Sequence, residues 1–260
     1  MKALLAAIAL SLGGPAALAQ VTPPPLSPQC EAPNVDIATP APLPRLASRL
    51  GEGGTIRILA IGSSSTWGIG ASSRRKAYPA ILRGILEAAL KGSKAEIINR
   101  GVSGEIAKTT AERLRTAVAL DKPDVVLWQV GTNDALARVD PDEFEETVRT
   151  TISWLKASDI DPVLVGLQYA PKFARDDSYF AIREALKKVA ATENVLYVRR
   201  YDAMQFIARH TSDSDLMSGD DLHLNDLGYE CMAEHVARAV IANLFVRRRD
   251  LPKPIPPPQP

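Results

Sequence analysis

The sequence predicts an α/β protein built on a parallel five-stranded sheet with helices on both faces. From Gly54 onward, short apolar runs alternate with longer amphipathic segments, which is the order of consecutive β-α units. The amphipathic segments place apolar residues three and four positions apart, as a helix does when one face packs on a sheet. The length of 260 residues, with 46% hydrophobic and 23% charged residues, suits one globular domain, and we find no internal repeat.

The elements follow one another in a regular order along the chain. The run TIRILAI begins the sheet and four later apolar runs continue it, so the expected strands are residues 55–61, 95–99, 124–130, 162–167 and 195–198. The amphipathic segments between them give the expected helices 78–90, 105–120, 142–158 and 179–192. One more helix is expected to end at His210, and a last one to run from about Asn225 to Leu244.

The N-terminal residues have the pattern of a secretory signal peptide. Lys2 precedes an apolar run from Ala3 to Leu12, and Ala17-Leu18-Ala19 supplies the small residues that a signal peptidase requires. We expect residues 1–19 to be cleaved, which makes the mature protein secreted or periplasmic, without stable membrane insertion. A retained membrane anchor is the alternative, although the apolar run is short for a bilayer and is interrupted by glycine and proline.

Proline-rich segments flank the expected domain, which spans residues 51–246. Eight prolines lie between residues 21 and 45, in the N-terminal arm formed by residues 20–50, and six lie in the basic, proline-rich tail 247–260. Proline lacks an amide hydrogen and interrupts helix and sheet hydrogen bonding. Both segments are therefore expected to be extended and to bury little apolar surface.

Composition argues against nucleic acid and structural metal as partners. Of the 31 Lys and Arg residues, Lys2 lies in the signal peptide, which leaves 30 basic residues against 30 acidic ones. This balance gives no electrostatic reason to expect nucleic acid. The chain has two cysteines and no histidine cluster, so no metal site is expected. In an oxidising compartment Cys30 and Cys231 could form a disulfide, and two free thiols are the alternative.

The polar motifs of the chain fall where the expected strands end. Gly62 to Gly68 follows the first strand, Gly101 to Glu105 the second, and Gly131 to Asp134 the third. Ligand sites in open α/β sheets form at the carboxyl ends of the strands. The three loops are therefore expected to face one crevice.

The first of these loops holds three consecutive serines, and a serine nucleophile requires a base with an acid to orient it. His223 lies in the loop SGDDLHLND, after Asp220 and Asp221, and an acid three residues before a histidine can reach its Nδ1 atom. The alternative is that the two aspartates form a turn and that Asn225 or Asp226 caps the last helix. His210 and His235 are interpreted as partly exposed helical residues.

Oxyanion donors are expected from the neighbouring strand ends. Gly104, in NRGVSGE, offers a backbone N–H without a side chain to obstruct a substrate, and Asn133, in QVGTNDA, offers a side-chain amide. Each motif taken alone is equally typical of an ordinary turn. Their order along the chain is more specific than either motif.

The order of these motifs resembles the SGNH, or GDSL-type, hydrolase superfamily over about residues 54 to 245. A serine follows the first strand, a glycine the second and Gly-Thr-Asn-Asp the third, and Asp-x-x-His stands just before the last helix. The resemblance implies a flavodoxin-like, three-layer α/β/α sandwich and hydrolysis of esters of lipids, aryl alcohols, thiols or acetylated sugars, without a cofactor. It assigns the nucleophile to Ser64, the acid and base to Asp220 and His223, and the oxyanion hole to the Ser64 N–H, Gly104 and Asn133.

The chain departs from that family pattern at one position. Where the family has Gly-Asp-Ser, this sequence reads Gly62-Ser63-Ser64, and the replaced acid is not the acid of the family's triad. Loop packing is expected to change more than the mechanism. The serine run also leaves Ser63 and Ser65 as alternative nucleophiles, and Ser64 is preferred because it keeps the Gly-x-Ser spacing.

The resemblance, together with the expected export, implies a secreted serine esterase that removes short acyl groups, such as acetyl, from an envelope or extracellular polysaccharide or from a small molecule. Polar segments 69–77 and 169–178 should border the crevice, and Trp67 could cap a short acyl pocket or stack on a sugar, with a place in the core as the alternative. A lipolytic or thioester hydrolase for longer acyl chains, a non-catalytic carbohydrate-binding protein and an envelope scaffold are the other hypotheses. The sequence does not determine the oligomeric state.

Overall fold

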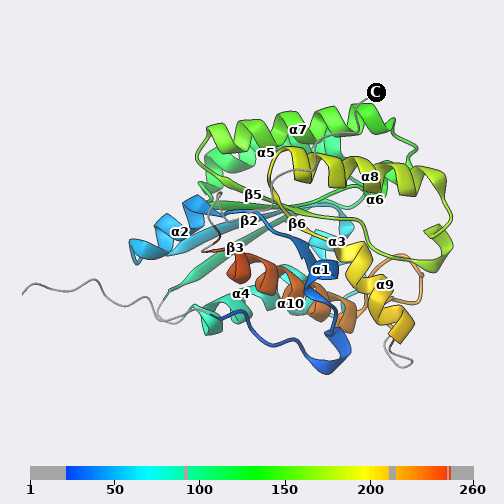
Figure 1. The fold of residues 1–260 in the computed structure, drawn as a ribbon, viewed down its shortest axis with the longest axis horizontal. Helices are drawn as coiled ribbons and strands as arrows, with labels where there is room; N and C mark the ends of the chain where they lie inside the picture. The colour runs from blue at the N-terminus through cyan, green and yellow to red at the C-terminus, as the bar shows by residue number, and fades with distance from the viewer. Residues whose placement is uncertain (1–21, 91–92, 211–214, 245, 247–260) are drawn as a thin grey trace, which may run out of the picture.

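The computed structural model describes residues 22–90, 93–210, 215–244 and 246. In this part of the chain a six-stranded sheet lies between two layers of helices (Figure 1), with the strand order β1-β6-β5-β4-β2-β3. The predicted α/β/α sandwich is confirmed. The expected signal peptide, residues 1–19, and the expected tail, residues 247–260, lie outside the described residues.

Five of the six strands are the predicted ones, and they are parallel. They are β2 (Ile56–Gly62), β3 (Ala95–Gly101), β4 (Val125–Gln129), β5 (Asp161–Val165) and β6 (Leu196–Val198). Ile58 of the central strand β2 lies opposite Ile97 of β3 on one side and Val125 of β4 on the other. Because the pairing is parallel, these strands end at one edge of the sheet.

The helices bury one core on each face of the sheet. α4 (Tyr78–Ala89) and α10 (Asp226–Asn243) cover one face, and α5 (Ala107–Asp121), α7 (Pro141–Ala157) and α8 (Asp177–Thr192) cover the other, as Figure 1 shows. Side chains of a strand point alternately to opposite faces. Ile58 and Ala60 therefore join the core under α4 and α10, whereas Leu59 and Ile61 join the core under α5 and α7.

The expectation of an extended N-terminal arm is wrong for residues 22–50. This segment forms η1 (Pro28–Cys30), α1 (Asn34–Ile37), β1 (Ala38–Thr39) and α2 (Pro44–Gly51), and β1 adds a sixth strand antiparallel to β6. Ile37, Leu43 and Leu46 are almost fully buried. Pro28 and Pro44 stand at the start of their helices, where the missing amide hydrogen has no intrahelical acceptor to lose.

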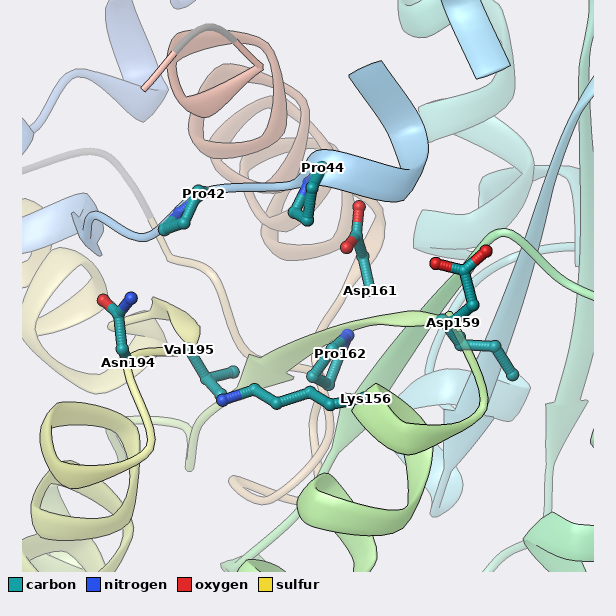
Figure 2. Close-up of a pocket in the computed structure, with 9 residues that line it drawn as sticks. Pro42, Pro44, Lys156, Asp159, Asp161, Pro162, Asn194 and Val195 are labelled. Atoms are coloured by element: carbon teal, nitrogen blue, oxygen red, sulfur yellow. The ribbon is translucent and has the colours of Figure 1, made fainter. Parts of the chain in front are cut away.

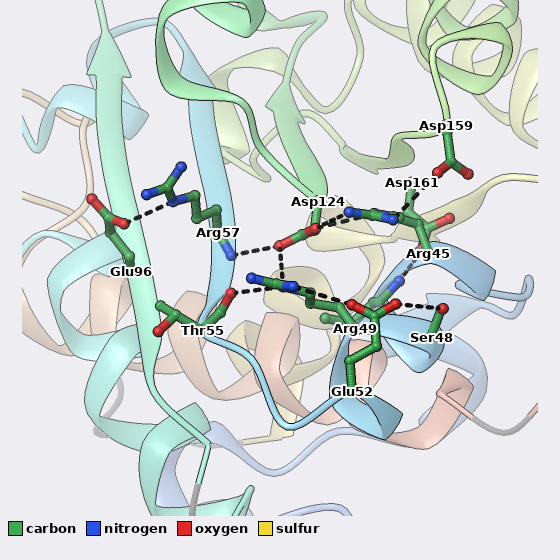
Figure 3. Close-up of polar contacts among 11 residues, drawn as sticks. Arg45, Ser48, Arg49, Glu52, Thr55, Arg57, Glu96, Asp124, Asp159 and Asp161 are labelled. Carbon is green, nitrogen blue, oxygen red and sulfur yellow. Dashed lines mark hydrogen bonds and ion pairs between the residues drawn. The ribbon is translucent and has the colours of Figure 1, made fainter.

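Polar contacts fix the arm to the edge of the sheet where the strands begin. Asp124, just before β4, accepts hydrogen bonds from Arg45 Nε at 3.1 Å and from the backbone N–H of Arg57 at 2.9 Å (Figure 3). Asp161, at the start of β5, accepts one from the backbone N–H of Leu46 at 2.9 Å. These bonds hold α2 at the end of the sheet opposite the polar loops.

A disulfide between Cys30 and Cys231 ties the arm to α10. The two Cα atoms are 4.9 Å apart and the residues are separated by 201 positions. In the chain-entropy model a bridge that closes so long a loop stabilises the fold by about 5 kcal/mol before strain. His235, one turn along α10, is buried and its Nε2 donates to the carbonyl of Cys30 at 2.7 Å. No helix in the described part of the chain has the length and apolarity needed to span a bilayer.

Burial of His235 predicts a specific loss of stability in acid. Burial lowers the pKa of His235 from 6.5 to about 4, so the imidazole stays neutral in the folded protein while the unfolded chain takes up a proton below about pH 6.5. The stabilising contribution of the neutral ring is present above pH 6.5 and is lost as the pH falls through the folded pKa. Between about pH 7.5 and 4.5 this group should remove about 2 kcal/mol from the free energy of unfolding.

The test compares wild type with His235→Gln, which cannot titrate, by urea unfolding with the disulfide intact. The variant should be less stable at neutral pH and should lose about 2 kcal/mol less than wild type on acidification. An unchanged pH dependence in the variant would show that His235 is not the group responsible.

Candidate active site

Ser64 stands where the chain leaves the central strand. β2 ends at Gly62, and the short helix α3 (Ser64–Trp67) begins two residues later. The Ser64 side chain faces the loop before α10, and its Oγ lies 3.0 Å from His223 Nε2. The two residues are 159 positions apart in the sequence and meet at the carboxyl edge of the sheet.

The other two serines of the run face the protein interior. Ser63 donates from its N–H at 3.1 Å and from its Oγ at 2.9 Å to Oε1 of Gln129 in β4. Ser65 donates to Oε1 of Gln168 at 3.3 Å and accepts from Arg200. Both side chains are buried, whereas Ser64 contacts a histidine. The geometry therefore favours Ser64 over Ser63 and Ser65 as the nucleophile.

Asp220 orients His223 within one short loop. Its Oδ2 lies 2.5 Å from His223 Nδ1, and its Oδ1 accepts from the backbone N–H groups of Leu222 at 2.9 Å and His223 at 2.8 Å. The hydrogen bond from the His223 ring, followed by these backbone amides, holds the pKa of Asp220 well below its usual range. An ionised Asp220 keeps the hydrogen on Nδ1 and leaves Nε2 free to accept from Ser64.

Asp221 has a different role from Asp220. It is exposed, takes a positive φ of 53°, and donates its N–H to the carbonyl of Ser218 at 3.0 Å, which closes the turn. Asn225 caps α10 by accepting from the N–H of Gly228 at 2.9 Å. Turn formation and capping, the alternative to a catalytic loop, thus coexist with the Asp220–His223 pair.

The remaining histidines lie away from Ser64. His210 ends α9 (Arg200–His210), is exposed, and has its Nδ1 2.8 Å from the carbonyl of Phe206. His235 is buried in α10 against the arm, so the expectation that it is partly exposed is wrong. Neither contacts the serine run.

The loops that carry the candidate oxyanion donors are joined to each other. Asn133, in the short helix α6 (Thr132–Leu136), donates from Nδ2 to the carbonyl of Glu105 at 2.8 Å, and its second amide hydrogen has no acceptor among the described residues. Gly104 takes a positive φ of 83°, which glycine adopts without strain, and is exposed. Ser64 is the first residue of α3, so its N–H has no intrahelical acceptor.

Two acidic residues that sequence reasoning missed support these loops. Glu105 accepts from Arg113 Nε at 2.6 Å and from Thr110 Oγ1 at 3.0 Å, which fixes the residue after Gly104 to α5. Asp134 accepts from the N–H of Ala107 at 2.8 Å, and burial raises its pKa to about 6. The available signal was their position, since each directly follows a candidate oxyanion residue.

The two polar segments expected at the crevice do border it. Gly70 passes so close to the loop that carries His223 that a Cβ at Gly70 would meet the carbonyl of Leu224 at 2.3 Å and Cβ of His223 at 3.1 Å. From the other side, Lys172 Nζ donates to the carbonyl of Asp220 at 3.2 Å. Trp67 is 39% exposed with the Arg74 guanidinium 3.6 Å from its ring centroid, so its expected alternative place in the core is wrong.

A cavity of about 280 Å³ lies at the opposite end of the sheet. Figure 2 shows Pro42 and Pro44 of the arm on one side of it, and Asp161 and Pro162 at the start of β5 on the other. Neither Ser64 nor His223 is among the residues that line this cavity. Within the described residues, no group of three or more His, Cys, Asp or Glu side chains could hold a metal ion.

Comparison with known proteins relates this chain to esterases. Residues 29–245 match the family described as "Non-GDSL lipase-like family". The chain is 27% identical over 145 residues to the "Thioesterase 1/protease 1/lysophospholipase L1" of Escherichia coli (strain K12), which covers 55% of this chain and 66% of that protein, just under two thirds. It is 28% identical over 212 residues to an "Acetylxylan esterase" of Xylanibacter ruminicola, covering 71% of this chain and 43% of that protein.

A solved structure shares the fold. The two-domain esterase described as active on acetylated mannans superposes with a TM-score of 0.70 at 18% identity, over 88% of this chain and 62% of that chain. At this identity the likeness concerns the fold alone.

The two aspartates of the loop provide a matched test of the Asp220–His223 contact. Asp220→Asn should lower ester turnover by about 100-fold or more, because an amide cannot hold the imidazole in the required tautomer or stabilise its charged form. Asp221→Asn should retain turnover within about threefold, because asparagine tolerates a positive φ and Asp221 does not touch the ring. Steady-state rates of both variants on an aryl acetate decide the matter, and equal losses would contradict the assignment.

Proposed function

The chain belongs to the Non-GDSL lipase-like family of the SGNH hydrolase superfamily, and on that premise we propose that it is a secreted serine esterase that removes short acyl groups, acetyl above all. The observation that carries the proposal is the chain of hydrogen bonds from Ser64 through His223 to Asp220. Such a chain activates a serine hydroxyl for attack on an ester carbonyl.

Acylation follows from the orientation of the histidine. With Nδ1 donating to Asp220, Nε2 accepts the Ser64 proton as Oγ attacks the carbonyl carbon of the ester. The Ser64 N–H, the Gly104 N–H and the free amide hydrogen of Asn133 would stabilise the oxyanion. As the tetrahedral intermediate collapses, the bond to the alcohol breaks, and the charged His223 returns its proton to the leaving alcohol.

Deacylation uses the same groups with water in place of the alcohol. Nε2 of His223 accepts a proton from water, the hydroxide oxygen attacks the acyl carbon, and the bond to Ser64 Oγ breaks. The proton then returns to Ser64, and the carboxylic acid leaves. Neither acylation nor deacylation requires a cofactor in this mechanism.

The substrate class that we propose is an acetylated polysaccharide. An acetylxylan esterase and an esterase active on acetylated mannans stand among the similar proteins. The exposed Trp67, three residues from Ser64, offers an aromatic surface of the kind that stacks on a sugar ring. The polar segments 69–77 and 169–178 beside the catalytic loop favour a polar substrate over a long acyl chain.

Export is proposed on two grounds. The N-terminal residues have the pattern of a signal peptide, and the Cys30–Cys231 disulfide is of a kind that forms and persists in oxidising compartments. Both favour a secreted or periplasmic protein.

A longer acyl chain is the second candidate substrate. Three exposed apolar side chains, Trp67, Val102 and Leu136, belong to the loops or short helices that follow β2, β3 and β4. A thioesterase and lysophospholipase also stands among the similar proteins. These observations favour the lipolytic alternative.

Hydrolysis by the purified protein tests the proposed activity. Wild type should hydrolyse 4-nitrophenyl acetate, and Ser64→Ala should lower kcat at least about 1,000-fold because no other hydroxyl contacts His223 Nε2 among the described residues. Ser63→Ala serves as the control and should keep activity within about tenfold. If Ser64→Ala remained as active as wild type, the serine mechanism would be wrong.

Acyl-chain preference tests the substrate class. On a series of 4-nitrophenyl esters, kcat/KM should peak at about two to four acyl carbons. Each further methylene gains about 0.8 kcal/mol only if an apolar wall buries it, and the bordering segments 69–77 and 169–178 are polar. Trp67→Ala should broaden the tolerance towards longer chains. A rise in kcat/KM that continued to about eight carbons in wild type would favour the lipolytic alternative.

A further inference from the structure

Arg200 is a buried charge next to the candidate nucleophile. It begins α9, directly after the sheet, and only 1% of its surface is exposed. In the ranges that the structure describes, it forms no ion pair with a carboxylate. Burial lowers its pKa, but a guanidinium stays protonated in proteins. A buried charge without a counter-ion is strongly unfavourable, so its hydrogen bonds have to compensate.

The Nη1 atom of Arg200 donates to Sδ of Met232 in α10 at 3.7 Å, and the hydrogen bonds of Nη2 lead to the serine run. The Nη2 atom donates to Oε1 of Gln168 and, at 3.3 Å, to Oγ of Ser65. Ser65 in turn donates to the same Gln168 oxygen at 3.3 Å. The guanidinium thus holds the residue that follows Ser64.

Gln168 extends the contact to the histidine loop. It lies just beyond β5, and the hydroxyl of Tyr179 fixes its backbone by donating to its carbonyl at 2.7 Å. The Nε2 atom of Gln168 donates to the carbonyl of Leu222, the residue before His223. The buried amide of Gln168 therefore forms a bridge between Ser65, which follows Ser64, and Leu222, which precedes His223.

The chemistry of arginine fixes the direction of this bridge. Arginine has donors and no acceptor, so the Gln168 oxygen has to face Arg200. The amide nitrogen then has to face the carbonyl of Leu222. A side chain without the charge would let the amide turn over and place its oxygen against that carbonyl.

We propose that Arg200 and Gln168 are positioning residues that hold Ser64 and His223 at hydrogen-bonding distance by joining their two loops. The inference rests on the proposed function, because it concerns the same triad. Neither residue touches the reacting atoms. A shift of about 1 Å between reacting groups can cost 100-fold in rate, so loss of the bridge should lower kcat and leave KM nearly unchanged.

Gln168→Glu removes the bridge with the least disturbance. The carboxylate keeps an acceptor for Arg200 and Ser65 and gains an ion pair with the guanidinium, so the fold should be retained. It loses the donor to Leu222 and places an oxygen against that carbonyl instead. On 4-nitrophenyl acetate, kcat should fall by about 10- to 100-fold with KM within about threefold.

Arg200 itself is tested with a conservative rescue and a matched control. Arg200→Met should lower kcat about 100-fold, and Arg200→Lys, which keeps a charged donor, should recover at least about tenfold of that loss. Arg183→Met is the control. Arg183 lies in α8 and pairs with Asp202, which is in the same helix as Arg200, α9. Among the described contacts, Arg183 has none with Gln168 or with the loops that carry Ser64 and His223. Its kcat should stay within about threefold of wild type.

A structural readout separates this inference from the proposed function. In a crystal structure of Gln168→Glu, the Ser64 Oγ to His223 Nε2 distance should exceed the 3.0 Å of the wild-type contact and pass beyond hydrogen-bonding reach. An unchanged distance, or an equal fall of kcat in Arg183→Met, would overturn the positioning role. A wild-type protein that hydrolysed no ester would refute the proposed function, while the distance would still decide the bridge.

Discussion

The parallel pairing of β2 with β3 and β4 is the constraint on which the site depends. Gly62 lies opposite Gly101 in that register, and the carbonyl of Gly62 accepts from the N–H of Val102 just beyond the pair. The loops that follow these strands therefore leave the sheet side by side. Ser64, Gly104 and Asn133 stand on those three loops, so backbone hydrogen bonding places them together before any side-chain contact is made.

The base and its acid reach this edge by a different route. They lie just before α10, and α10 packs against α4 on one face of the sheet. The disulfide to Cys30 and the hydrogen bond from His235 to the same cysteine add the arm to this helix. The position of His223 thus depends on the packing of a helix on the sheet, whereas the position of Ser64 depends on the end of a strand. Contacts between separate loops, such as that of Gln168 in the loop after β5 with Leu222, join parts that the fold positions independently.

Ser63 stands where the GDSL-type pattern has an aspartate, and the structure offers a local explanation for this replacement. The N–H and hydroxyl of Ser63 both donate to Gln129, in the neighbouring strand β4, and Thr66 donates to the same oxygen at 3.4 Å. A serine hydroxyl can donate to an amide oxygen, which an ionised aspartate cannot do. Ser63 thus fits its loop to a glutamine and leaves the adjacent Ser64 free to face His223.

The elements with local signals could be predicted from the residues alone. Apolar runs and helical periodicity gave the five parallel strands and the main helices, and the order of the polar motifs predicted a crevice with Ser64, His223 and Asp220. Proline content misled in the arm, because burial of Ile37 and Leu46 and pairing with β6 outweigh the local preference of the chain. Gln168 and Arg200 carry no local signal, since a glutamine after a strand and an arginine at the start of a helix are ordinary residues. Their contact beside Ser65 and Leu222 could not be predicted, because it joins segments that come together only when the sheet and its helices have packed.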